Sequence, residues 1–203
     1  MLELPPTVRI PREDETPPDK SVRERLKKYT TANIVEGYSL SKNLKTSDSP
    51  LFDFYAEINV NNSRLWNLVS NLASLFPENL SLIFGYDSDH LFYGNYREKH
   101  SILTEIEPFK RELVQDGFME WGLIYHDENR LVEIFVKGPK YLQCWGDNLQ
   151  AFLEIIETFG LNEIPNLEFI DEYPKVIESL WHMDNSVYQT SELIEKLKEK
   201  NCG

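Results

Sequence analysis

The histidines and Cys144 are the side chains of this chain that could act as a base, a metal ligand or a nucleophile. His90 follows Asp87-Ser88-Asp89, and His126 precedes Asp127-Glu128. A histidine beside carboxylates is typical of an acid–base or a metal site. Cys144 could act as a nucleophile only if a base were aligned with it. One hypothesis is therefore an enzyme whose site lies near His90, His126 or Cys144.

A less specific interpretation accounts for the same residues. Both histidine segments fall in expected hairpin turns, where polar side chains occur in any protein. Cys144 lies in an apolar strand, which favours a buried and unreactive thiol. The sequence contains no GxGxxG, GxxxxGK[ST], CxxC, HExxH or GxSxG pattern. It therefore predicts no metal and no cofactor, and it favours a protein that is not an enzyme.

A second group of residues could bind a protein rather than carry out a reaction. Trp121 and Tyr125 share strand parity, as do Tyr141 and Trp145, so each pair can lie on one face of a sheet. Exposed aromatic residues with an acidic rim are typical of a protein-binding surface, whereas the alternative is that they fill the core. The candidate partner-binding residues are Trp121, Tyr125, Tyr141, Trp145, Glu154, Glu157, Asp171 and Glu172.

The charge of the chain is strongly negative and unevenly spread. Residues 1–100 contain 12 Lys/Arg and 14 Asp/Glu, a net charge of −2, whereas residues 101–203 contain 9 and 20, a net charge of −11. Such a surface repels phosphate backbones and anionic membranes, so nucleic acid and membrane are disfavoured as partners. It favours a basic protein partner through electrostatic complementarity. The alternative is that the acidity only maintains solubility.

The segment from Gly117 to Gly160 must position most of these candidates. Three strands are predicted, over 118–125, 131–136 and 141–145, with polar or Gly-Pro turns between them. In the second strand, Leu131, Glu133 and Phe135 lie on one face, and the more apolar Val132, Ile134 and Val136 form the core face. A helix with an apolar stripe follows, with Asp147 as the expected N-cap and Gly160 as the stop.

The remaining elements are expected on both sides of this meander. Strands are predicted over 51–60 and 80–86 with a hairpin partner over 90–96, and helices over 61–76, 99–116 (kinked at Pro108) and 191–200. Five of the eleven prolines lie in residues 1–20, which predicts an extended, poorly ordered arm. A short basic helix capped by Ser21 over 21–29 and a loop over 39–50 follow. An edge strand is expected in 161–170 and a short helix in 173–183.

This order of elements predicts an α+β fold with a largely antiparallel sheet, helices packed on one face and an α-rich C-terminal tail. The predicted organisation has three parts: an extended Pro-rich arm and a short helix in 1–50, a single α+β domain in 51–170, and a helical tail packed on it in 171–203.

The segment from about Phe118 to Leu161 resembles the end of small acidic bacterial α+β proteins of the immunity type. The resemblance rests on the hairpin GFMEWGLIY…LVEIFV, the strand KYLQCW and the acidic helix after it, and it covers about a fifth of the chain. It implies a non-enzymatic cytoplasmic inhibitor of a toxin, often a basic nuclease. The Pro-rich arm and the long C-terminal tail depart from that pattern, and no functional residue is carried over.

Together these observations favour a cytoplasmic, non-enzymatic, acidic protein-binding module. No apolar run approaches the ~20 residues that cross a bilayer, and no continuous apolar signal region begins the chain. The two cysteines, Cys144 and Cys202, do not indicate a disulfide framework. The alternatives are the enzyme described above and a structural or regulatory subunit whose N-terminal arm becomes ordered on binding.

Overall fold

One large antiparallel sheet organises the molecule. The computed structural model describes residues 2–43, 51–86 and 90–202, and over these ranges the chain has an α+β fold. The sheet has the strand order β2-β3-β9-β8-β7-β4-β5, and β6 pairs with the first residues of β4. Its strands are β2 (Gly37–Lys42), β3 (Phe54–Asn59), β4 (Asn79–Gly85), β5 (Leu91–Tyr93), β6 (Arg97–Glu98), β7 (Glu120–His126), β8 (Leu131–Val136) and β9 (Leu142–Gly146). The fold class predicted from the sequence is confirmed.

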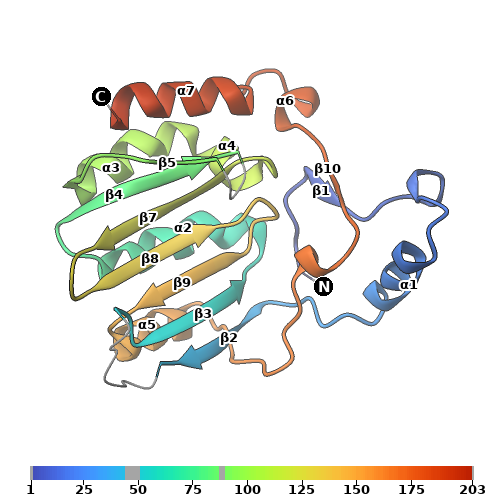
Figure 1. Ribbon diagram of the computed structural model, residues 1–203, viewed down its shortest axis with the longest axis horizontal. Helices are drawn as coiled ribbons and strands as arrows, with labels where there is room; N and C mark the ends of the chain where they lie inside the picture. Colours follow the sequence, from blue (N-terminus) through green and yellow to red (C-terminus); the bar gives the residue numbers. More distant parts are fainter. Residues whose placement is uncertain (1, 44–50, 87–89, 203) are drawn as a thin grey trace.

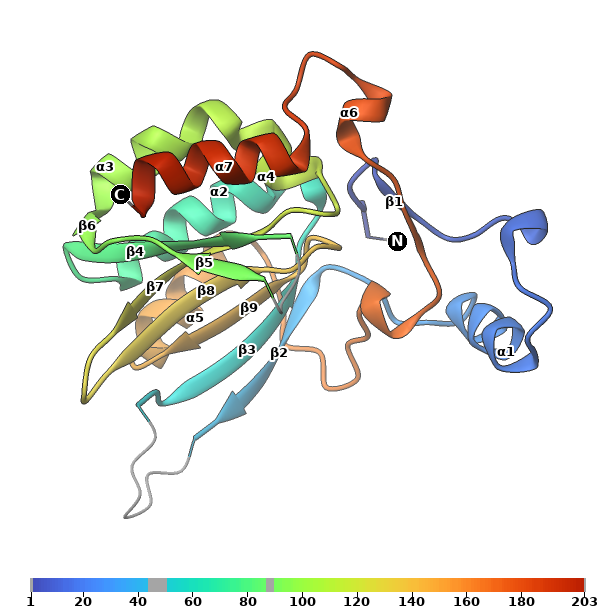
Figure 2. The ribbon, with the colours of Figure 1, turned by 45° about the horizontal axis from the view of Figure 1, so that its top comes forward.

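Helices cover one face of this sheet. They are α2 (Asn62–Leu72), α3 (Lys99–Ile106), α4 (Lys110–Gln115), α5 (Leu149–Thr158) and α7 (Thr190–Asn201). Figure 1 shows α2 and α5 behind the strands, and Figure 2 shows α3, α4 and α7 gathered over the β4 end. Apolar residues of all five helices belong to the same core cluster as the strand residues that face them. The opposite face of the sheet is therefore left without a helix in the described parts of the chain.

The strand alternation explains why the core forms on that face. In β8, Val132, Ile134 and Val136 are at most 1% exposed, as predicted. Residues that are paired across neighbouring strands point to the same face of the sheet, so they form rows across it. One such row is Ala56, Cys144, Ile134, Leu123 and Leu82, and all five side chains are buried.

The predicted helix signals are largely confirmed. Leu65, Leu68, Val69 and Leu72 of α2 form its buried stripe. Pro108 lies in the 3-10 turn η3 (Glu107–Phe109), which separates α3 from α4, because a proline cannot continue an α-helical hydrogen-bond ladder. Gly160 has a φ of 64° just after α5, the left-handed conformation that ends helices.

Both helix caps proposed from the sequence were wrong by one or two residues. Asn148, not Asp147, caps α5, and its Oδ1 accepts a hydrogen bond from the backbone of Ala151 at 3.1 Å. Asp147 instead forms an ion pair with Arg130 at 2.6 Å. In α1 (Lys20–Tyr29), Asp19 is the N-cap and accepts from the backbone of Ser21.

One predicted loop, one predicted strand and the extent of one predicted helix were also wrong. Residues 39–42, assigned to a loop, belong to β2 and pair with β3, so the sheet begins before residue 51. Residues 44–50 of that predicted loop and the predicted turn at Asp87-Ser88-Asp89 lie outside the described residues. Residues 161–170 form no strand beyond one parallel bridge between Tyr38 and Glu163. The helix expected in 173–183 is limited to α6 (Leu180–Met183), because β10 (Val176–Ile177) precedes it.

The N-terminal arm is not a free segment. Its strand β1 (Val8–Arg9) pairs antiparallel with β10, and Thr7 and Val8 are buried. Val8 packs with Ile34, Ile170 and Tyr173 in a second small core. The N-terminal arm is thus joined, beside the main sheet, to the segment that precedes the last two helices.

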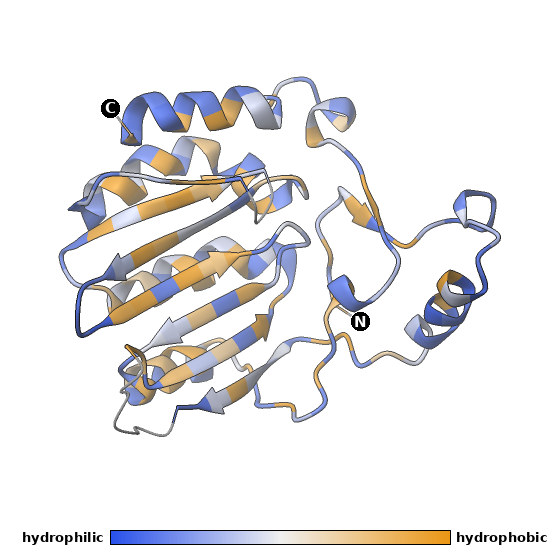
Figure 3. Cartoon of the chain, viewed as in Figure 1, coloured by the Kyte–Doolittle hydropathy of each residue, from blue (hydrophilic) through white to orange (hydrophobic). Residues whose placement is uncertain are grey.

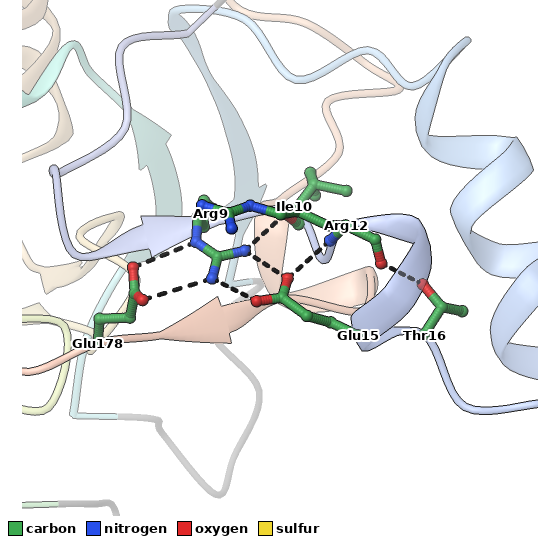
Figure 4. Close-up of polar contacts among 6 residues, drawn as sticks. All are labelled: Arg9, Ile10, Arg12, Glu15, Thr16 and Glu178. Atoms are coloured by element: carbon green, nitrogen blue, oxygen red, sulfur yellow. Dashed lines mark hydrogen bonds and ion pairs between the residues drawn. The ribbon is translucent and has the colours of Figure 1, made fainter.

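Arg9 reinforces this junction. Its guanidinium binds both carboxylate oxygens of Glu15 at 2.7 Å and donates to Glu178 at 3.1 Å (Figure 4). The Arg9 hydrogen bonds, with one from the backbone of Arg12, lower the pKa of Glu15 to about 2. Glu15 lies in the 3-10 turn η1 (Glu13–Glu15), so a local turn of the arm is tied to the C-terminal segment.

Among the described residues, no helix is both long enough and apolar enough to cross a lipid bilayer.

Candidate functional site

The helix-free face of the sheet, called here the open face, carries both aromatic and polar side chains. Figure 3 shows hydrophobic and hydrophilic residues mixed along the strands, whose successive side chains point to opposite faces. The central residues of the open face are Tyr55, Glu57, Glu133, Phe135, Gln143 and Trp145, contributed by β3, β8 and β9.

Strand register arranges these residues in two rows. One row contains Tyr55, Trp145, Glu133, Ile124 and Ser81, and the next contains Glu57, Gln143, Phe135, Gly122, Ile83 and Tyr93. Register partners in an antiparallel sheet have Cβ atoms about 4.5–5.5 Å apart, so neighbours in a row are in contact. Glu133 therefore lies directly between Trp145 and Ile124.

An aromatic pair and a polar network occupy the β3–β9 side of the open face. The rings of Tyr55 and Trp145 lie 4.8 Å apart at an angle of 38°. Gln143 donates from Nε2 to the Tyr55 hydroxyl at 2.9 Å and to Glu57 at 3.4 Å. Burial raises the pKa of Tyr55, and its hydrogen bond with Glu57 adds to the shift. The pair is thus held in place from one side.

Other carboxylates on or beside the open face have partners. Glu120 forms an ion pair with Lys137 at 3.0 Å and accepts from the backbone of Gly138. Asp171 forms an ion pair with Lys175 at 2.7 Å and hydrogen-bonds with Tyr141. Glu57 is bound by Gln143. These groups are neutralised or hydrogen-bonded within the chain.

Glu133 differs from these carboxylates. It is half-buried, and no residue that the structure describes gives it a hydrogen bond or an ion pair. Burial alone raises the pKa of Glu133 to about 7, from an ordinary value of 4.5. A carboxylate taken out of water without a partner destabilises its own charged form. At neutral pH this position favours any cation that can reach it.

One end of the open face is closed by the chain itself. The ring of Phe169 lies 4.9 Å from that of Tyr141, and both are buried with Leu167. Asn59, at the end of β3, donates to the backbone carbonyl of Glu168 at 2.9 Å. The segment around 164–171 thus borders the face at the Tyr141 end, while the Trp145 end is not covered by it.

The eight partner-binding residues proposed from the sequence do not form one surface. Tyr141, Trp145 and Asp171 lie on or beside the open face. Trp121 is 0% exposed, packs against Trp66 with ring centroids 5.8 Å apart and donates from Nε1 to the carbonyl of Leu113, so it belongs to the core.

The other four lie elsewhere. Tyr125 has the parity of the core face, and its hydroxyl donates to Asp127 at 2.7 Å. Glu154 and Glu157 are exposed on α5, on the helical side. Glu172 contacts the N-terminal arm, because its backbone carbonyl accepts a hydrogen bond from the guanidinium of Arg25 in α1.

The residues named for an enzyme site do not converge. Gly85 pairs with Leu91, which follows His90, and with Glu120 at the start of β7. His126 ends β7, six residues further on. Six residues of strand span about 20 Å, so His90 and His126 lie near opposite ends of the sheet. Cys144 is 0% exposed on the core face, where burial raises the pKa of its thiol. No cluster of three or more His, Cys, Asp or Glu suited to a metal ion occurs among the described residues.

Lys140 is a second ionisable group with a strongly shifted pKa. Burial lowers its pKa to about 7, and the nearby carboxylates of Asp116 and Glu120 oppose the shift. Its ammonium donates to the backbone carbonyl of Met119, and the side chain is 4% exposed. This lysine joins the β8–β9 turn to the start of β7, and it is closed to a substrate.

Sequence reasoning placed Glu133 on the correct face but missed its importance. A single glutamate in an alternating strand usually faces water. The sequence predicted that β8 and β9 are neighbours in a meander, but not the register that sets Glu133 opposite Trp145.

Comparisons with protein-family models, with curated proteins and with solved structures found no match to this chain. The function therefore has to be inferred from the geometry of the open face.

Proposed function

We propose that this chain is a non-enzymatic protein-binding module whose open face binds a basic protein. The observation that supports this most directly is the half-buried carboxylate of Glu133 beside the Tyr55–Trp145 pair, because no described residue forms a hydrogen bond or an ion pair with that carboxylate. A face with aromatic anchors and an unmatched charge is suited to a protein partner of opposite charge.

The charge of the whole chain supports the same kind of partner. The net charge is −13, with −11 in residues 101–203. A long-range negative field increases the association rate of a basic protein, and complementary contacts then fix its orientation. The resemblance of residues 118–161 to immunity-type proteins makes a basic toxin our specific proposal for the partner.

Capture from the lysate of the source cell tests this proposal. The immobilised chain is compared at low and at high salt with the double variant Glu133→Gln/Trp145→Ala and with the control Glu154→Gln/Glu157→Gln on α5. We expect a basic protein that the wild type and the control retain at low salt. The open-face variant should lose most of it, because both the anchor and the unmatched charge are gone.

The control separates the open face from general acidity. Removing two exposed α5 carboxylates lowers the net negative charge more than the open-face variant does, yet it leaves the open face intact. Equal loss from both variants would support general electrostatic attraction and contradict a specific face. Retention of no protein at either salt concentration would contradict the proposal as a whole.

A further inference from the structure

We propose that Glu133, Trp145 and Tyr55 form a subsite for a single guanidinium group, the side chain of a partner arginine. This inference rests on the proposed function and specifies the chemistry of its central contact. The carboxylate and the aromatic pair occupy consecutive positions of one cross-strand row, so one planar cation can contact both.

The carboxylate contributes the charge. Among the described residues, the neighbours of Glu133 in its row are Ile124 on β7 and Trp145 on β9, and neither can neutralise it. Two polar groups lie near Glu133. Tyr55, on the far side of β9, is already engaged with Gln143 and Glu57, and Cys144 lies on the core face. A bound cation would supply the charge-assisted hydrogen bonds that Glu133 lacks.

The aromatic pair contributes a surface for the cation. A cation within about 6 Å of an aromatic centroid is attracted by the negative face of the ring, most strongly by tryptophan. The open face already contains one such contact, because Lys137 Nζ lies 5.3 Å from the Phe135 ring while it pairs with Glu120. Lys137 and Glu120 thus show within the chain the combination that Glu133 and Trp145 offer to a partner.

Guanidinium fits this subsite better than ammonium for two reasons. It is planar and stacks on aromatic rings, and its paired N–H groups match both oxygens of a carboxylate. It is also less strongly hydrated than ammonium, so less free energy is lost when it enters a half-buried position. A partner arginine is therefore the predicted occupant, with lysine as the weaker alternative.

NMR titration of the intact chain with N-acetylarginine amide tests the subsite without the partner. At about pH 8, the indole N–H signal of Trp145 and the labelled carboxyl signal of Glu133 should shift together. The neutral isostere N-acetylcitrulline amide should bind roughly fivefold to tenfold more weakly, because it lacks the charge that pairs with Glu133. The lysine amide should fall between the two.

Two variants and one control make the test specific. Glu133→Gln preserves size and should abolish the preference for arginine over citrulline, and Trp145→Leu should weaken arginine binding. Glu154→Gln should leave the titration unchanged. Between about pH 8 and pH 6, arginine binding to the wild type should weaken about threefold to fivefold, because most of Glu133 becomes protonated. Glu133→Gln should lose this dependence.

Equal binding of arginine and citrulline, or an unchanged preference in Glu133→Gln, would overturn the subsite. If a basic partner is captured through the open face while the arginine probe fails, only this subsite is wrong. If the probe binds while no partner is captured, the subsite stands and the proposed function fails.

Discussion

The two faces of the sheet differ in how far they bury their side chains, and two tryptophans show the difference. Trp121 lies on the helical face, is completely buried and donates its indole N–H to Leu113. Trp145 lies on the open face, is half-buried and packs against Tyr55 with its ring tilted by 38°. The first tryptophan is enclosed by the chain, whereas the second is enclosed on one side only.

The two faces differ in how many of their side chains find partners within the chain. On the helical face, apolar side chains from five helices belong to one core cluster with the strand residues of the central row, all of which are buried. On the open face, Glu57, Glu120 and Asp171 have partners within the chain, whereas the half-buried Glu133 has none among residues 2–43, 51–86 and 90–202. Contacts within the chain therefore satisfy the side chains of the helical face, whereas on the open face the proposed partner would supply the contact that Glu133 lacks.

The largest difference between the faces should appear on removal of each tryptophan. Trp121→Ala creates a large cavity and removes a buried hydrogen bond, so it should lower the free energy of unfolding by about 3–5 kcal/mol. Trp145→Ala should lower it by about 1 kcal/mol, because less of its surface is buried. Denaturant unfolding of both variants measures this, and equal losses would contradict the distinction.

A smaller effect is expected at Gly122, beneath the Phe135 ring on the open face. A Cβ at this position would lie 2.3 Å from the backbone oxygen of Ile134 and 3.0 Å from the Phe135 ring. Gly122→Ala should therefore cost about 1–3 kcal/mol of stability, because the β7–β8 pairing must shift. Thermal unfolding measures the loss, and an unchanged midpoint would show that the two strands are less tightly paired than described.

Glu133 should make stability depend on pH in an unusual direction. Its pKa is about 7 in the folded chain and 4.5 ordinarily, so the unfolded chain ionises first. The cost of burying the charge is absent below about pH 4.5, grows as the pH rises and is complete above about pH 7. Glu133→Gln should therefore be more stable than the wild type by about 2–3 kcal/mol at pH 8, and equal to it near pH 4. A variant that is less stable at pH 8 would reveal a partner for Glu133 within the chain.

The smallest effect should be local and confined to the arm. Glu15 has a folded pKa of about 2, below its ordinary 4.5, so its contact with Arg9 is complete above about pH 4.5 and is lost as the pH falls toward 2. Glu15→Gln should remove this pH dependence and increase amide hydrogen exchange at β1 and β10. The main sheet should keep its protection, and a loss of protection there would mean that the arm supports the whole fold.

The sequence was most informative where one periodicity dominates. Alternation identified β8 and its core face, and the apolar stripe of α2 was read correctly. It failed at β2, whose sequence GYSLSK is polar because the strand lies at the edge of the sheet. Local cap geometry, such as the choice of Asn148 over Asp147, depends on the competing ion pair with Arg130 and could not be read from spacing.

The candidate site was less predictable than the fold. Tyr141 and Trp145 were chosen correctly as a pair on one face, but Trp121 was grouped with them because parity within a strand does not fix which face is the core. Glu133 gained its importance from three facts of the folded chain: its register beside Trp145, its burial, and the absence of a partner among the described residues. None of these is a property of the local sequence.

Hydroxyl-radical footprinting of the chain alone and with the captured basic partner tests the central claim most directly. Aromatic side chains report their own exposure, and the open face contains Tyr55 and Trp145. We predict that oxidation of both falls in the complex, while Tyr96 and Tyr188, exposed on other elements, remain equally reactive. Unchanged oxidation of Trp145, with protection elsewhere, would contradict the assignment of the open face as the binding surface.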